Sequence, residues 1–273
     1  MNASAPKYIV FLNSKIGYYR IGSGDQPVIA LHGYGESGAH FAYLQQTAGE
    51  QNRTILAIDL PFHGQTEWKD GLTVTAAHLQ GIFRQILEAE KLKNNTSFEL
   101  WGYSMGGRIA LGYFQAFPLE VRKLIIIAPD GIYVNPWYRF ATATQFGNII
   151  FKRTMQHPTW FMNLLNAGYR LKLINKSIFK FATNYVDDPQ VRHDLYIRWT
   201  AFRKIHPSKN KLLHLIKKHQ VPVTGIYGEF DRIIPYSKAE KFWEKITSKK
   251  NVFILSDGHK LLQSKYACYL WKD

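Results

Sequence analysis

The chain has 273 residues, 46% of them hydrophobic and 20% charged, so it can bury a sizeable core and is not expected to be disordered. Its formal net charge of +15 admits a polyanionic partner, an acidic substrate or a solvated basic surface. Because the lysines are spread in pairs rather than gathered in one block, we favour the solvated surface and expect no nucleic-acid partner. The single cysteine, Cys268, excludes an internal disulfide and fits a reducing compartment.

The amino-terminal segment lacks the features of a targeting sequence. Its apolar run at residues 8–12 is too short for a signal-peptide core, and a basic start is missing. No segment approaches the roughly 20 apolar residues that cross a bilayer. We therefore expect a cytoplasmic protein without membrane insertion.

Short β-rich runs alternate with helical patterns through residues 1–130, which is typical of a largely parallel sheet covered by helices. An opening hairpin is expected from residues 7–15 and 16–21. Helices are expected to begin at Thr73 and at Met105. Further strands are expected at residues 28–31, 55–60, 98–101 and 124–128.

The alternation stops near Gly131 and resumes after Lys211. Between them, apolar residues recur at helical spacing, for example at Trp160, Leu164, Ala167 and Leu171. We expect an inserted helical cap at residues 131–211, with most of its aromatic residues packing it onto the core. Residues 1–130 and 212–273 are expected to form that α/β core. Its last elements are strands at 221–227 and 251–255 and helices at 236–246 and from 260 to the end.

The sharpest local signal is the segment Gly102–Gly107, GYSMGG, which contains a G-x-S-x-G motif between an expected strand and helix. A nucleophile in such a motif sits on a strained turn, where glycines let neighbouring backbone approach closely. The free N–H groups and dipole of the following helix favour developing negative charge. The motif therefore predicts that Ser104 is a catalytic nucleophile.

A serine hydroxyl is a weak nucleophile unless a base takes its proton, and that base needs an orienting acid. Asp231 follows one late strand and His259 follows the last strand, so both belong to the sheet edge that carries Ser104. We assign Asp231 and His259 as the acid and the base. Glu229 and Asp257 are alternative acids, although Asp257 is only two residues from His259.

A tetrahedral oxyanion needs preorganised donors, usually two backbone N–H groups. One donor is expected at Met105, directly after the nucleophile. The second is expected at Tyr34, in the loop that follows His32 and Gly33. The ring of His32 is expected to support this loop and not to act as a second base.

These motifs resemble those of the α/β-hydrolase superfamily over nearly the whole chain. The supporting segments are HGYG at 32–35, DLPFHG at 59–64, GYSMGG at 102–107, GEFD at 228–231 and GH at 258–259. The resemblance implies a mostly parallel central sheet flanked by helices, with a helical cap. Phe62 stands where this family usually has glycine, which leaves the geometry of that turn open. Haloalkane dehalogenases and epoxide hydrolases of the superfamily use aspartate at the elbow, so Ser104 argues against both.

The preferred function is a carboxylesterase-like hydrolase that acts through an acyl-enzyme on a small ester, thioester or related carbonyl compound. Tyr103 and Arg108 are candidate substrate-binding residues. Arg108 also makes the elbow similar to that of the pyruvate-eliminating synthase of the menaquinone pathway, so a triad-dependent lyase stays open. A non-catalytic ligand receptor on the same fold is the third possibility. No metal-ligand spacing is visible, and the triad chemistry requires no cofactor.

Overall fold

The computed structural model describes residues 5–92, 97–134, 136–174, 179, 183, 185–246 and 250–272, without the side chains of residues 136 and 137. The chain divides into two compact units. The first comprises Met1–Tyr133 with Ile205–Asp273, and the second comprises Val134–Lys204.

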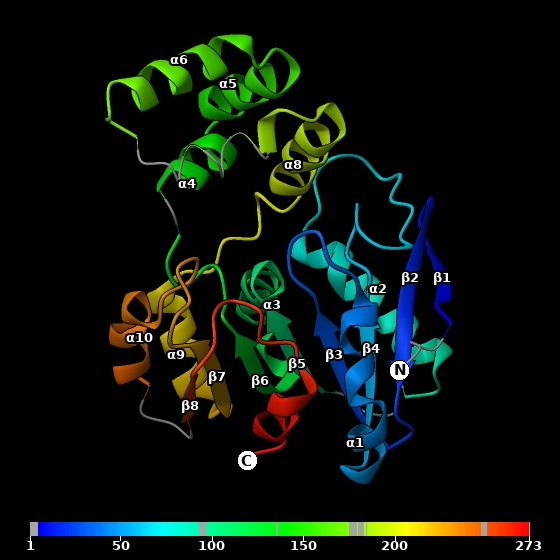
Figure 1. The fold of residues 1–273 in the computed structure, drawn as a ribbon. Helices are drawn as coiled ribbons and strands as arrows, with labels where there is room; N and C mark the ends of the chain where they lie inside the picture. Colours follow the sequence, from blue (N-terminus) through cyan, green and yellow to red (C-terminus); the bar gives the residue numbers. More distant parts are fainter. Residues whose placement is uncertain are drawn as a thin grey trace. The chain divides into compact units, whose positions relative to one another are not determined.

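The first unit is built on an eight-stranded sheet with the order β1-β2-β4-β3-β5-β6-β7-β8 (Figure 1). Strand β1 pairs antiparallel with β2, and β2 pairs antiparallel with β4, whereas the remaining neighbours are parallel. The sheet is therefore mostly parallel, as the sequence predicts. The strands are β1 Lys7–Phe11, β2 Ser14–Ile21, β3 Gln26–Leu31, β4 Arg53–Ile58, β5 Phe98–Tyr103, β6 Val121–Ile127, β7 Val223–Gly228 and β8 Lys250–Leu255.

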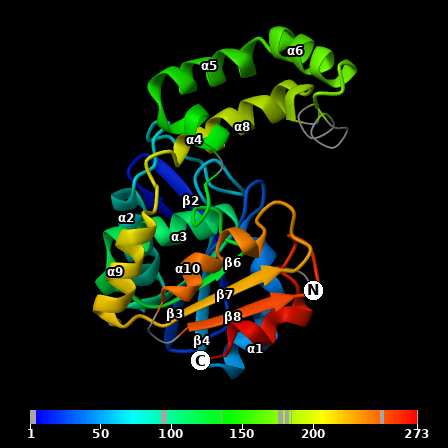
Figure 2. The ribbon, with the colours of Figure 1, turned by 90° about the vertical axis from the view of Figure 1, so that its left-hand side faces the viewer.

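The central strands are buried on both faces because helices cover the sheet from both sides. Every residue of β4, β5 and β7 is buried, which explains their continuous apolar runs. Figure 2 shows α2, α3, α9 and α10 on one face of the sheet and α1 on the other. The helical elements are η1 Gly38–Leu44, α1 Gln45–Glu50, α2 Ala76–Ala89, α3 Met105–Ala116, η2 Pro118–Glu120, α9 Lys209–His219, η3 Tyr236–Lys238, α10 Glu240–Glu244 and η4 Ser264–Leu270, where η marks a 3₁₀-helix.

Three predicted helices differ in their bounds or their type. Helix α2 begins at Ala76, after Thr73, because the Thr75 hydroxyl caps it by accepting the amide of His78. The expected helix at 236–246 is a 3₁₀ turn followed by the short α10. The expected C-terminal helix is the 3₁₀-helix η4, whose buried residues Ala267 and Leu270 are three apart, as the 3₁₀ repeat requires.

The second unit consists of helices, namely α4 Pro136–Ala143, α5 Gln145–Gln156, α6 Thr159–Arg170 and α8 Pro189–Ala201 among the described residues. Helix α5 packs against α4 and α8. The Phe151 ring contacts the rings of Tyr196 and Trp199. The unit is shorter than the predicted 131–211 because α9, which begins at Lys209, packs on α3 in the first unit. No helix in the described part of the chain is long and apolar enough to span a bilayer.

Candidate active site

Ser104 lies on a sharp turn between β5 and α3, with backbone angles φ 51° and ψ −114°. A residue other than glycine rarely adopts these backbone angles, so the turn is strained. The glycines on either side allow it. A Cβ on Gly102 would lie 2.5 Å from the carbonyl oxygen of Gly106, and one on Gly106 would lie 2.3 Å from that of Leu31. The motif therefore has the geometry expected of a nucleophile elbow.

Ser104, His259 and Asp231 form one hydrogen-bonded chain. The His259 Nδ1 atom lies 2.7 Å from Asp231 Oδ2, and its Nε2 atom lies 3.0 Å from Ser104 Oγ. Since a carboxylate only accepts, Nδ1–H donates to Asp231, which leaves neutral Nε2 to accept the Ser104 hydroxyl proton. The structure thus brings together the three residues that the sequence singles out from separate strand ends.

The Asp231 carboxylate is held on both oxygens. Its Oδ1 atom accepts the backbone amides of Ile233 at 2.8 Å and Ile234 at 2.9 Å, while Oδ2 accepts His259. Burial alone raises the pKa of Asp231, but the hydrogen bonds from His259 and the two amides outweigh it, so this pKa lies below its usual value. Asp231 is therefore ionised at neutral pH, as an acid that orients a histidine must be.

The loops that carry Asp231 and His259 are bound to each other through their backbones. The amide of Glu229 donates to the carbonyl of Leu255 at 2.8 Å, and the amide of Phe230 donates to that of Asp257 at 3.0 Å. A Cβ on Gly228 would lie 2.2 Å from the carbonyl oxygen of Gly258. Only glycine at 228 lets the two loops approach this closely.

The alternative acids have other partners. Glu229 accepts the hydroxyl of Ser256 at 2.9 Å. Asp257 accepts its neighbour's amide at Gly258 and the side chains of Lys265 and Tyr266. These bonds lower the pKa of Asp257 to about 2 and order the loop before His259. Asp257 thus binds groups of its own loop and of the following segment, and its position in the sequence did not reveal these contacts.

The loop after β3 lies against the start of α3. His32 is buried, and its Nε2 atom accepts the amide of Leu60 at 3.0 Å, so its Nδ1–H donates to the Gly33 carbonyl at 2.7 Å. The ring therefore supports the loop, which is the role expected from the sequence. Met105 is the first residue of α3, where amides have no acceptor within the helix.

Glu36 is a residue of this loop that the sequence reasoning missed. Its Oε2 atom accepts the amide of Gly33 at 3.1 Å, which occupies that donor and leaves Tyr34 as the oxyanion-hole candidate from this loop. Burial raises the pKa of Glu36, although the Gly33 amide and nearby cationic groups oppose the rise. Glu36 directly follows the HGYG segment of the proposed oxyanion loop. This position in the sequence could have indicated that its carboxylate contacts the loop.

Both candidate substrate-binding residues are buried. The Tyr103 hydroxyl donates to the backbone carbonyl of His259 at 2.9 Å. The Arg108 side chain is 1% exposed, and its Nε atom lies 3.5 Å from Asp130 Oδ2. These contacts favour a positioning role for Tyr103 and a structural ion pair for Arg108, while substrate binding by either residue stays a prediction.

The loop after β4 is held by backbone hydrogen bonds to Asp59. The Asp59 carboxylate accepts the amides of Gly38 and Gln65, each at 2.6 Å. Phe62, which replaces the usual glycine, has φ 66° in the left-handed region. The backbone at Phe62 thus has the left-handed conformation that favours glycine, although the residue is phenylalanine.

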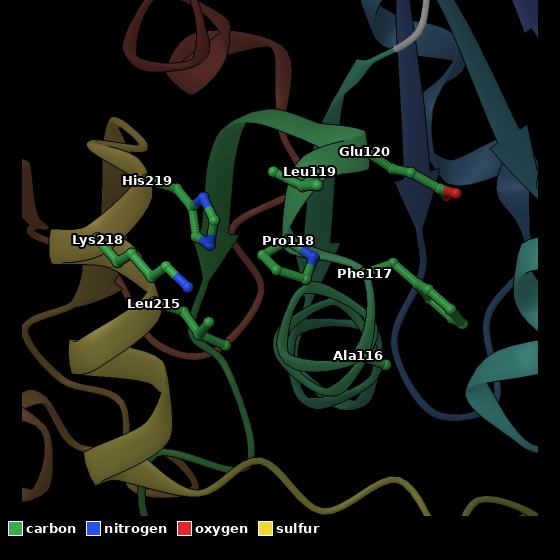
Figure 3. A pocket seen from close by; sticks show the side chains of 8 residues that line it. All are labelled: Ala116, Phe117, Pro118, Leu119, Glu120, Leu215, Lys218 and His219. Carbon is green, nitrogen blue, oxygen red and sulfur yellow. The ribbon is translucent and has the colours of Figure 1, made fainter.

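Two further features lie outside this site. Among the described residues, no group of three or more His, Cys, Asp or Glu side chains could hold a metal ion. A depression of about 430 Å³ lies between η2 and α9 (Figure 3). Its lining residues are Ala116–Glu120, Leu215, Lys218 and His219. It is at the far end of α3 from Ser104, about 18 Å away along a helix of this length.

The chain matches the family model described as "alpha/beta hydrolase fold" over residues 26–265, and it therefore belongs to the α/β-hydrolase family. Two of the curated relatives that it matches carry hydrolase names. It is 27% identical to the "Uncharacterized hydrolase YugF" of Bacillus subtilis, covering 86% of this chain and 84% of that protein. It is 36% identical to a "Probable serine hydrolase" of Drosophila melanogaster over 44% of this chain and 35% of that protein.

Solved structures carry the same fold. A thermophilic esterase from Thermogutta terrifontis superposes with a TM-score of 0.68 at 15% identity, covering 98% of this chain and 96% of that one. At this identity the likeness establishes the fold alone.

Proposed function

We propose that the protein is a serine hydrolase that transfers an acyl group to water through an acyl-enzyme on Ser104. The observation that carries this proposal is the hydrogen-bonded chain from Ser104 Oγ through His259 to Asp231, with links of 3.0 and 2.7 Å. These atoms are already within the distance that proton transfer requires. The serine hydrolase name of a similar protein belongs to the same reaction class.

In the proposed reaction Ser104 Oγ attacks the carbonyl carbon of the substrate while His259 Nε2 takes the hydroxyl proton. The amides of Met105 and Tyr34 stabilise the oxyanion. His259 then gives its proton to the leaving group, which departs as the acyl-enzyme forms. A water molecule, deprotonated by His259, attacks the acyl-enzyme and releases the acid and Ser104. As the acid leaves, His259 returns the proton taken from water to Ser104 Oγ, and Asp231 stabilises the imidazolium each time it forms.

The substrate is proposed to be a small ester, thioester or related carbonyl compound. A lyase that eliminates pyruvate needs cationic groups at its substrate, and Arg108, which motivated that alternative, is buried against Asp130. No structural observation therefore favours the lyase. The helical cap at residues 131–211 stays a prediction.

Hydrolysis of p-nitrophenyl acetate and butyrate tests the proposal. Ser104→Ala is expected to lower kcat by about 10⁴-fold or more, since triad residues act as a unit. Ser208→Ala is the matched control, because Ser208 is exposed and its side chain makes no capping bond at α9. Equal turnover by Ser104→Ala and wild type would refute the proposal.

A fluorophosphonate probe distinguishes the enzyme from a receptor on the same fold. The probe reacts with an activated serine without any knowledge of the substrate. Labelling of wild type and of Ser208→Ala, with none on Ser104→Ala, is the expected result. A folded wild-type protein that resists labelling would favour the receptor.

A further inference from the structure

Helix α6 in the second unit exposes an apolar stripe. Trp160, Leu164, Ala167 and Leu171 fall on one side of the helix, within about 60° of one another at 3.6 residues per turn. Trp160 is 48% exposed, Leu164 63% and Leu171 69%. Within the second unit, the described residues leave these side chains exposed, and the packing of the cap's aromatic residues onto the core stays a prediction.

Helix α6 buries few of its side chains, so little burial stabilises it. Leu165 is its only buried residue, and it lies on the side opposite the stripe. Burial of an apolar face normally supplies most of the stability of a helix. The large exposed stripe therefore indicates a surface that another apolar phase covers.

The charge of the second unit restricts what that phase is. Residues 134–204 contain eleven Lys and Arg against three Asp and Glu, a net +8 of the chain's +15. Arg170 and Lys172 are exposed on either side of Leu171, and Lys152 and Arg153 are exposed near the end of α5. An apolar face bordered by cations is complementary to a surface that is apolar inside and anionic outside.

We propose that α6 docks this unit on an anionic phospholipid surface. Trp160, Leu164 and Leu171 enter the boundary between headgroups and acyl chains, while Arg170 and Lys172 contact lipid phosphates. Tryptophan and leucine on one side with Lys and Arg beside them are the composition of helices that lie in the membrane interface. The docking is peripheral. Nucleic acid, the other polyanion, would not account for the exposed leucines, because proteins bind it through ionic and polar contacts and through aromatic rings that stack on its bases.

Sedimentation with vesicles tests the proposal. Wild type at low ionic strength is expected to bind vesicles of phosphatidylcholine with phosphatidylglycerol and to bind pure phosphatidylcholine much more weakly. Leu164→Gln with Leu171→Gln should weaken binding by about tenfold for each leucine. Leu119→Gln, at a residue 76% exposed in the first unit, is the matched control and should bind as wild type does.

A second pair of variants tests the charges. Arg170→Gln with Lys172→Gln should weaken binding to anionic vesicles by about fivefold for each residue and reduce the salt dependence. Lys217→Gln with Lys218→Gln removes the same charge from exposed positions of α9 and should have a much smaller effect. Equal effects of the two pairs would mean that net charge alone drives the attraction, which would overturn the docking site.

Other occupants of the stripe give different results. If it is covered by the first unit or by a second copy, Leu164→Gln with Leu171→Gln lowers the melting temperature or splits an oligomer seen by light scattering. If nucleic acid is the partner, wild type binds duplex DNA and no vesicles. Either result overturns the proposal, as does wild type that ignores anionic vesicles. Ser104→Ala should bind vesicles as wild type does, so the outcome is independent of the proposed catalysis.

Discussion

The Tyr103 hydroxyl donates a 2.9 Å hydrogen bond to the backbone carbonyl of His259, and the two rings lie with their centroids 5.4 Å apart. The residue directly before the nucleophile is thereby bound to the loop that carries the proposed base. This contact ties β5 to the segment after β8 across 156 positions of sequence. Tyr103 thus fixes where His259 lies relative to Ser104.

Removal of this hydroxyl should impair catalysis more than binding. Tyr103→Phe keeps the ring but loses one hydrogen bond, which is worth about 1 kcal/mol. We expect kcat for p-nitrophenyl butyrate to fall by about three- to tenfold with little change in KM. Steady-state kinetics with the purified variant measures both constants.

Tyr113→Phe is the control for this prediction. Tyr113 is also buried, and its hydroxyl donates to Glu120, away from the site. This variant should lose stability without a change in kcat. If both variants lower kcat equally, Tyr103 has no special positioning role.

Gly228 should not tolerate a methyl group. In Gly228→Ala the new Cβ would meet the Gly258 carbonyl oxygen at 2.2 Å, so the two loops must separate. We expect a loss of about 1–3 kcal/mol in the free energy of unfolding. Because Asp231 and His259 then move apart, kcat/KM should fall by about a hundredfold.

Gly258→Ala is a demanding control, since it adds the same methyl group to the facing loop. Apart from its own chain neighbours, no described residue has an atom within 4 Å of its new Cβ. Stability and kcat/KM should both stay close to those of wild type. A Gly258→Ala protein as damaged as Gly228→Ala would contradict the steric argument.

The turn at Phe62 should become more stable with glycine than with alanine. Phe62→Gly and Phe62→Ala both remove the phenyl ring, but only glycine adopts φ 66° without strain. We expect Phe62→Gly to be the more stable by about 1 kcal/mol in chemical denaturation. Equal stability of the two variants would mean that the left-handed conformation is not retained.

Glu36 should lower stability at neutral pH. Burial raises the pKa of Glu36 in the folded state above the unfolded value of about 4.3. The contribution of Glu36 to the free energy of unfolding is therefore complete below that value and is lost as the pH rises through the folded pKa. Glu36→Gln should therefore be more stable than wild type at neutral pH, with no difference below about pH 4. Urea denaturation across this range measures the effect.

Glu120→Gln should show the opposite sign. Burial raises the pKa of Glu120, but hydrogen bonds from Tyr113, Arg84 and Gln80 outweigh it, so the folded pKa is lowered. Its contribution is present above the unfolded value and lost as the pH falls. Glu120→Gln should thus be less stable than wild type at neutral pH. The same pH dependence in both variants would contradict the assigned shifts.

The sequence by itself determined the sheet-and-helix order and the elbow at Ser104, because buried parallel strands are continuously apolar and a nucleophile turn needs glycines. These are local requirements. It also indicated Asp231 and His259 from their positions after strands. It assigned Asp231 as the acid and kept Glu229 and Asp257 as alternatives, since all three follow strands at the same edge.

Only the tertiary structure shows which carboxylate meets His259 Nδ1, because that contact joins two loops that are far apart in the sequence. Three further features could not be predicted from the sequence. They are the burial of Arg108 against Asp130, the contact of Glu36 with the Gly33 amide, and the exposure of Trp160, Leu164 and Leu171. Helical spacing predicts that an apolar stripe exists, but what covers it depends on how distant segments pack. The chain's periodicity therefore predicted the order of its strands and helices, and long-range packing determined the surroundings of each side chain.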